Sequence, residues 1–155
     1  MHLTFDGFSI EQPRQRQHTE QQGKQANVTG KAAETAIYSV LHGKGYHVEK
    51  QKRKICLSIY GTPVKVDLYV TPCARWPLGL AIESKWQEAG GSVDEKYPFL
   101  VANIKERYPC PCIVILDGGG YRPGAARWLR AQADAQKLLH VFTLAEFLTW
   151  SNRNL

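Results

Sequence analysis

Two short segments of this 155-residue chain place charged residues on one face of an otherwise apolar strand. Residues 64–70 read VKVDLYV, and residues 80–85 read LAIESK. Because side chains alternate faces along a strand, Asp67 lies opposite the valines and leucine of the first segment, and Glu83 and Lys85 share one face of the second. If the two strands pair, Asp67 and Glu83 can come within about 5 Å of each other. The pattern therefore predicts neighbouring strands that bring together two carboxylates and a lysine.

Two carboxylates at that spacing repel each other unless a positive charge lies between them. A hard divalent cation fits this position, and oxygen ligands favour Mg²⁺, with Mn²⁺ as a substitute. The alternative is an ordinary sheet in which Asp67, Glu83 and Lys85 form solvated cross-strand ion pairs, which are common and contribute little.

The rest of the chain predicts helices and strands around these two segments. An apolar stripe from Ala32 to Leu41 indicates a helix, capped by Asn27 or Thr29 and ended by glycines. The continuous apolar run Cys112–Leu116 is typical of a strand buried on both faces. Further strands are expected at Tyr46–Glu49, Ile55–Tyr60 and Leu138–Phe142, and further helices near Val93–Arg107, Pro123–Lys137 and Leu144–Trp150. This order predicts a single α/β domain, a sandwich with a central mixed sheet flanked by helices.

The composition fits one compact, basic domain. Hydrophobic residues make up 43% of the chain, the formal net charge is +6 and the sequence pI is about 9.2, a balance that favours an acidic partner such as nucleic acid. Residues 1–28 are polar and rich in glutamine, so we expect a flexible arm there and a folded domain over residues 29–155. No apolar run is long enough to cross a membrane and no signal-peptide core is present, so we expect a cytoplasmic protein. The four cysteines form no CxxC pair, which favours free thiols over a zinc site.

The motif resembles the PD-(D/E)XK nuclease superfamily over about residues 29–130. Asp67 matches the first acidic position, and Glu83-Ser84-Lys85 matches the E-x-K. Glu34 is similar to the acidic residue that many members carry on the first helix. The chain departs from the pattern at Val66, where the motif has proline. The resemblance implies a restriction-endonuclease-like fold with an α-β-β-β-α-β core and a metal-dependent endonuclease that acts on DNA.

The resemblance also implies a role for each residue of the motif. Asp67, Glu83 and the backbone carbonyl of Ser84 would hold Mg²⁺, and Lys85 would orient water and stabilise negative charge. Glu34 would bind a second metal ion, although a first-turn acid is also favoured by the helix dipole alone. Gln87 would contact the phosphate or the water, or else is a surface amide.

Two basic groups are candidates for binding the nucleic-acid backbone, and each could equally be a solvated surface. One is a basic run before a predicted strand, and the other lies in and just before a predicted helix. Their members are Lys52, Arg53 and Lys54 in the first group, and Arg122, Arg127 and Arg130 in the second.

Two other kinds of function stay open at this point: a non-catalytic nucleic-acid-binding module of the same fold, and a scaffold that binds a protein partner. A double-strand cut would be easiest from a symmetric assembly, so a homodimer or higher homo-oligomer is also an open expectation.

Overall fold

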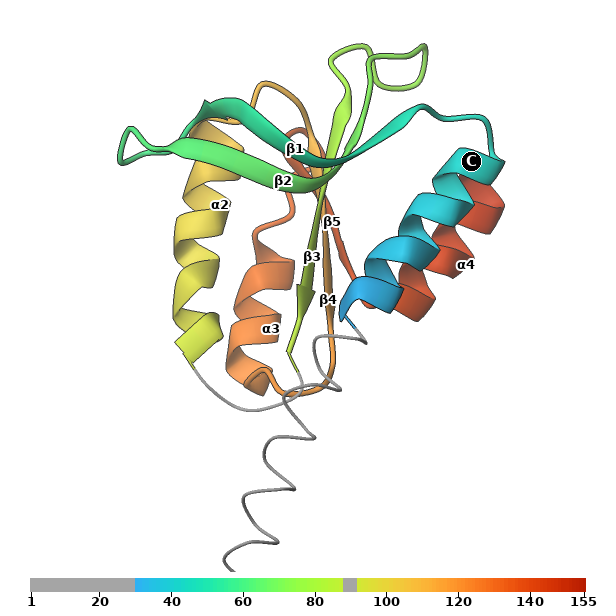
Figure 1. Ribbon diagram of the computed structural model, residues 1–155. Helices are drawn as coiled ribbons and strands as arrows, with labels where there is room; N and C mark the ends of the chain where they lie inside the picture. The colour runs from blue at the N-terminus through green and yellow to red at the C-terminus, as the bar shows by residue number, and fades with distance from the viewer. Residues whose placement is uncertain (1–29, 88–91) are drawn as a thin grey trace, which may run out of the picture.

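A computed structural model describes residues 30–87 and 92–155 of the chain, and it contains one mixed five-stranded sheet (Figure 1). The strands lie in the order of the sequence: β1 (Val48–Leu57), β2 (Pro63–Val70), β3 (Leu80–Trp86), β4 (Cys112–Asp117) and β5 (Leu138–Phe142). β1, β2 and β3 pair antiparallel, whereas β3, β4 and β5 pair parallel. The predicted α/β fold with a mixed sheet is confirmed, and the predicted arm at residues 1–28 lies outside the described residues.

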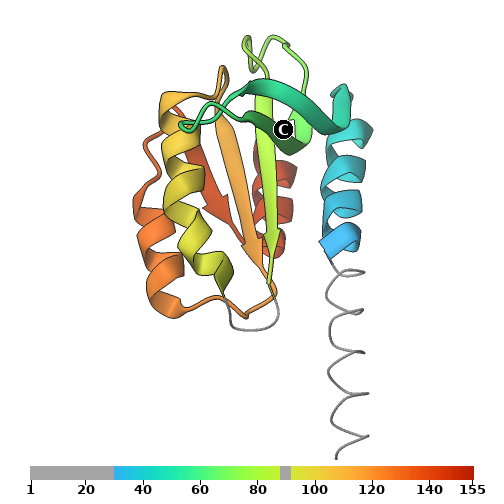
Figure 2. The same ribbon diagram turned by 60° about the vertical axis from the view of Figure 1, so that its left-hand side comes forward.

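Helices cover both faces of the sheet. The described helical segments are a first helix (residues 30–43), a short 3₁₀ helix η1 (Ser92–Lys96), α2 (Tyr97–Glu106), α3 (Pro123–Ala131) and α4 (Leu144–Asn154). The first helix and α4 lie on one side of the sheet, and α2 and α3 lie on the other; both views show this arrangement (Figures 1 and 2). Within the described part, no helix combines the length and the hydropathy needed to span a bilayer.

β4 lies between two apolar cores, as its continuous apolar run predicted. Val114 and Leu116 belong to the core beneath α2 and α3, whereas Ile113 and Ile115 belong to the core beneath the first helix and α4. None of the four is more than 1% exposed. Burying a side chain of this kind contributes about 1.5–3 kcal/mol, so the strand ties the two layers together.

The prediction of two separate strands before residue 61 is wrong, because β1 is continuous from Val48 to Leu57. Its register with β2 shifts between Lys52 and Cys56, and Gln51 and Lys54 have positive φ angles of 52° and 56°. Such an irregularity breaks the alternation of side chains that a sequence pattern relies on.

Two predicted ends are also corrected by local side-chain hydrogen bonds. β1 stops short of Tyr60 because the Ser58 hydroxyl accepts hydrogen bonds from the backbone N–H of Tyr60 and Thr62, which forms a turn. α3 ends at Ala131, short of Lys137, because Oδ1 of Asp134 accepts three backbone N–H groups, the last of them from Leu138 at 3.1 Å. The Asp134 turn leads the chain directly into β5.

Candidate active site

The two acids of the motif meet where β2 and β3 separate. The ladder between these strands runs from Val70 opposite Leu80 to Leu68 opposite Ile82 and stops there. One step further would place Asp67 opposite Glu83, but Oδ2 of Asp67 instead accepts a 2.8 Å hydrogen bond from the backbone N–H of Ser84. The carboxylate of Asp67 therefore occupies the place of the next ladder bond, beside Glu83.

Glu83 is a buried carboxylate that is held at both of its oxygens. Its side chain lies on the α2 side of β3 and the residue is only 3% exposed. Oε1 accepts a 2.9 Å hydrogen bond from the Tyr108 hydroxyl, and Oε2 lies 3.3 Å from Nζ of Lys85. Burial raises the pKa of Glu83 to about 7, against the attraction of Lys85, and the negative charge of Asp67 adds to the rise.

Lys85 lies two residues after Glu83 on the same face of β3, as the alternation predicted. Burial disfavours its charged form, but the attraction of Glu83 and Asp67 outweighs burial and raises the pKa of Lys85 above its ordinary value. The side chain keeps 33% of its surface exposed. Lys85 is therefore a fixed positive charge that solvent or a substrate can reach.

Glu34 approaches this site from the first helix. Its Oε2 accepts a 3.3 Å hydrogen bond from Nε2 of Gln51 on β1. Burial and the negative charge of Asp67 raise the pKa of Glu34, whereas Gln51, Lys65 and Lys85 act in the opposite direction. Glu34 thus shares an electrostatic environment with the motif residues, and its role as a metal ligand stays a prediction.

The three carboxylates provide the donor type that Mg²⁺ prefers, and a cation would relieve their repulsion. After burial, which is the larger cause, the charge of Asp67 raises the pKa of both Glu34 and Glu83, as expected for acids that share one site. In residues 30–87 and 92–155, however, no three His, Cys, Asp or Glu side chains converge into a metal-binding group. The residues fit Mg²⁺ in chemistry, and the predicted metal set stays a prediction.

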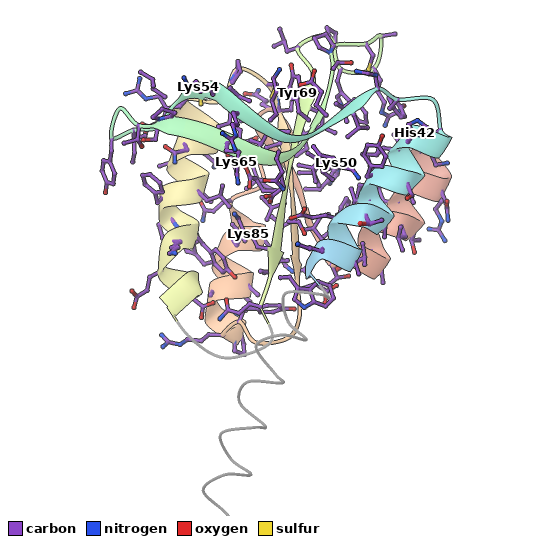
Figure 3. The ribbon with its side chains drawn as sticks, viewed as in Figure 1. His42, Lys50, Lys54, Lys65, Tyr69 and Lys85 are labelled. Carbon is purple, nitrogen blue, oxygen red and sulfur yellow. The ribbon has the colours of Figure 1, made fainter. Side chains whose placement is uncertain are left out.

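A pocket of about 270 Å³ opens beside this pair of charges. Glu83 and Lys85 line it together with Lys65, and Figure 3 shows Lys65 on β2 and Lys85 on β3 near α2. Lys65 lies two residues before Asp67 on the same strand, and the sequence analysis did not include it in the site. It missed Tyr108 entirely, because no local pattern links Glu83 to a residue 25 positions further on.

Gln87 directly follows β3, and hydrogen bonds join it to the glycine turn at residues 118–120 after β4. Its backbone carbonyl accepts the Gly120 N–H, and its Nε2 donates to the Gly120 carbonyl at 3.4 Å. Gln87 is 6% exposed, so the alternative of a surface amide is wrong. Its contact with a phosphate or with water stays a prediction.

The two predicted basic groups lie at opposite edges of the sheet. Lys52, Arg53 and Lys54 belong to edge strand β1, and Lys52 already pairs with Glu49 at 2.8 Å. Arg130 lies at the other edge, where it donates to the Val141 carbonyl of β5.

The arginines of the second group differ in their partners. Arg130 forms two hydrogen bonds with Glu146, at 3.1 and 3.5 Å, and Arg122 lies 3.8 Å from Asp94. Arg127 is exposed and has no ion-pair partner in the part of the chain that the structure describes. The structure therefore does not join the two groups into one surface, and Arg130 serves to link α3 to α4.

Comparison with known protein families identifies the family of the chain. The model of the PD-(D/E)XK nuclease superfamily domain matches residues 25–155, which includes the first helix, the whole sheet and α4. Searches of the curated proteins and of the solved structures found no match. The match extends the resemblance seen in the motif to the end of the chain. The chain therefore belongs to the PD-(D/E)XK nuclease superfamily.

Proposed function

We propose that this protein is a metal-dependent endonuclease that hydrolyses phosphodiester bonds in DNA. The observation that carries the proposal is the ion pair between buried Glu83 and partly exposed Lys85. The Asp67 carboxylate lies beside this pair, where it accepts a hydrogen bond from the Ser84 backbone N–H. A buried acid with a strongly raised pKa, beside a positive charge in a pocket, is typical of an active site. The basic net charge of +6 favours a polyanionic substrate.

Asp67, Glu83, the Ser84 carbonyl and Glu34 would hold Mg²⁺ or Mn²⁺. When bound, the ion would polarise the phosphate and lower the pKa of a water molecule. The hydrogen bond from Ser84 to Asp67 and the one from Tyr108 to Glu83 fix the two carboxylates before the ion arrives. Fixed ligands of this kind lose little conformational freedom when they bind.

Lys85 would stabilise the negative charge that develops on the phosphate oxygens. Its ammonium group is held 3.3 Å from Glu83 and remains partly exposed, so it needs little rearrangement to reach a substrate. A preorganised positive charge in a partly buried site stabilises a transition state more than the same charge in water does. Lys85 would also orient the attacking water.

The test is nicking of supercoiled plasmid DNA by the purified protein with Mg²⁺ or Mn²⁺. Lys85→Ala should lower the rate by about a hundredfold or more. Lys105→Ala is the matched control, because the Lys105 side chain has a similar exposure of 34% and pairs with Asp134 on the surface. Lys105→Ala should cut at the wild-type rate.

Two outcomes would contradict the proposal. One is the absence of nicking with either metal ion, and the other is nicking that survives unchanged in Lys85→Ala. DNA binding without metal binding, measured by calorimetric titration, would instead favour the non-catalytic module.

A further inference from the structure

We propose that the pocket beside Glu83 and Lys85 holds one unpaired nucleobase, so that the enzyme acts on nucleotides that are single-stranded or flipped out of a duplex. This inference rests on the proposed nuclease function and specifies its substrate. It is carried by three features of the pocket: its apolar wall, an oriented amide donor and the lysines that flank it.

The wall of the pocket is apolar and aromatic. β2 contributes Val64, and α2 contributes Tyr97, Phe99 and Leu100. The volume of about 270 Å³ lies just below the roughly 300 Å³ at which pockets for drug-sized ligands begin. This part of the wall carries no charged group, so it suits a flat ring of the size of a base better than a phosphate, which needs donors and charges in contact with it.

An aromatic stack continues the wall outward. The rings of Phe99 and Tyr60 lie 4.9 Å apart at an angle of 28°, and Tyr60 is 78% exposed although it is a large apolar side chain. Exposed aromatic rings beside a basic site are the platforms on which unpaired bases stack. Tyr60 and Phe99 therefore offer a base a surface at the mouth of the pocket.

Asn103 supplies a fixed hydrogen-bond donor. The residue lines the pocket and is only 4% exposed. Its Oδ1 accepts a 2.8 Å hydrogen bond from the Ile59 backbone N–H, which fixes the orientation of the amide. Nδ2 makes no hydrogen bond to the described residues and is not among their fully buried atoms without a partner, so it is open to the pocket. A base carbonyl or ring nitrogen could accept a hydrogen bond from it in place of water.

Positive charges flank the pocket where a strand would carry its phosphates. Lys65 and Lys96 line the pocket and are exposed, and Lys85 lies deeper on β3 (Figure 3). A base in the pocket would thus place its own phosphates among lysines and next to Glu83. The same geometry disfavours a paired base, because both its faces and its edge are already engaged in the duplex.

The experiment measures binding without cleavage. A fluorescent single-stranded oligodeoxynucleotide and the blunt duplex of the same sequence are titrated with the full chain in EDTA, with anisotropy as the readout. The single strand should bind about tenfold more tightly than the duplex. Tyr60→Ala and Phe99→Leu should each weaken single-strand binding by about five- to tenfold, because each removes one stacking contact.

The matched control is Trp128→Ala. Trp128 is also a large exposed aromatic residue, at 40% exposure, but it lies on α3. Unlike Tyr60, it has no ring contact with Phe99 of the pocket wall. Duplex binding as tight as single-strand binding would overturn the inference, and so would Tyr60→Ala behaving like Trp128→Ala.

The two proposals fail in different ways. A protein that prefers the single strand but nicks nothing with Mg²⁺ would overturn the nuclease and leave the base pocket standing. A protein that needs Lys85 to cut, yet binds duplex and single strand equally, would overturn the base pocket alone.

Discussion

The Tyr108 hydroxyl donates a 2.9 Å hydrogen bond to Oε1 of Glu83 and so joins the turn after α2 to the middle of β3. Tyr108 is 3% exposed and is itself held, because its N–H donates to the Asn103 carbonyl and its own carbonyl accepts from Nζ of Lys137. One oxygen of Glu83 is therefore fixed by Tyr108, while the other faces Lys85.

Removing the Tyr108 hydroxyl should weaken metal binding and catalysis. Tyr108→Phe leaves Oε1 of Glu83 without its donor, so we expect about tenfold weaker Mg²⁺ binding, as is usual when a ligand loses its supporting hydrogen bond. Calorimetric titration with Mg²⁺ measures the affinity. Tyr97→Phe is the control, since the buried Tyr97 hydroxyl has no hydrogen-bond partner within the described residues, and its loss should leave Mg²⁺ affinity unchanged. If both variants change Mg²⁺ affinity equally, the Tyr108 hydroxyl does not support Glu83 as a metal ligand.

The raised pKa of Glu83 should make stability depend on pH. The folded protein keeps this proton up to a pKa of about 7, whereas the unfolded chain releases it near 4.5. The folded state therefore binds more protons between these values, and the free energy of unfolding should fall as the pH rises through them, by about 3 kcal/mol in total.

Urea unfolding in EDTA across that pH range measures this fall. Glu83→Gln should flatten the profile and stabilise the protein near neutral pH. Glu95→Gln, which changes an exposed acid on η1, should keep the wild-type slope. A wild-type profile without the fall would show that Glu83 is ionised well below pH 7.

Mg²⁺ should stabilise the folded protein through Asp67. A ligand at a hundred times its Kd adds about 2.7 kcal/mol, which corresponds to a rise in Tm of about 5 °C or more for a chain of this size. Asp67→Asn should lose most of this rise, because it removes an anionic ligand, while Glu95→Gln should keep it. Thermal scans with and without Mg²⁺ compare the shifts, and an undiminished shift in Asp67→Asn would remove Asp67 from the metal site.

A glycine at the end of β4 is needed for the position of Gln87. Gly118 has a φ of +98°, and a Cβ there would lie 2.6 Å from the carbonyl carbon of Gln87 and 2.8 Å from its nitrogen. Gly118→Ala should therefore cost about 3 kcal/mol, from backbone strain together with displacement of β3. Gly119→Ala has a similar φ of +74° but nothing within 4 Å, so it should cost only about 1 kcal/mol. Denaturant unfolding of the two variants measures the difference in the free energy of unfolding. Equal losses of stability would show that the close approach of Gly118 to the Gln87 backbone is not important.

Much of the sheet could be predicted from local patterns. Alternation identified the faces of β2, where Val66, Leu68 and Val70 are buried, and it paired Glu83 with Lys85. These predictions succeed because a half-buried strand must repeat every two residues.

Other features depended on contacts that no local pattern encodes. The sequence predicts two strands in place of the continuous β1, because the positive φ angles of Gln51 and Lys54 interrupt the alternation of side chains along it. The end of α3 is set by one side chain, Asp134, whose Oδ1 accepts hydrogen bonds from three backbone N–H groups. Tyr108 and Asn103 reach the site only through the tertiary packing of α2, so their roles could not be predicted from the motif.

The bond from the Ile59 N–H to Asn103 fastens the tip of the β1–β2 hairpin to α2. The ring stack of Tyr60 on Phe99 joins the same turn to the same helix. Asn103 and Phe99 both line the pocket, whereas the turn lies outside the motif strands. A substitution in this turn would therefore act on the pocket wall and leave the positions of Asp67, Glu83 and Lys85 in the sequence untouched.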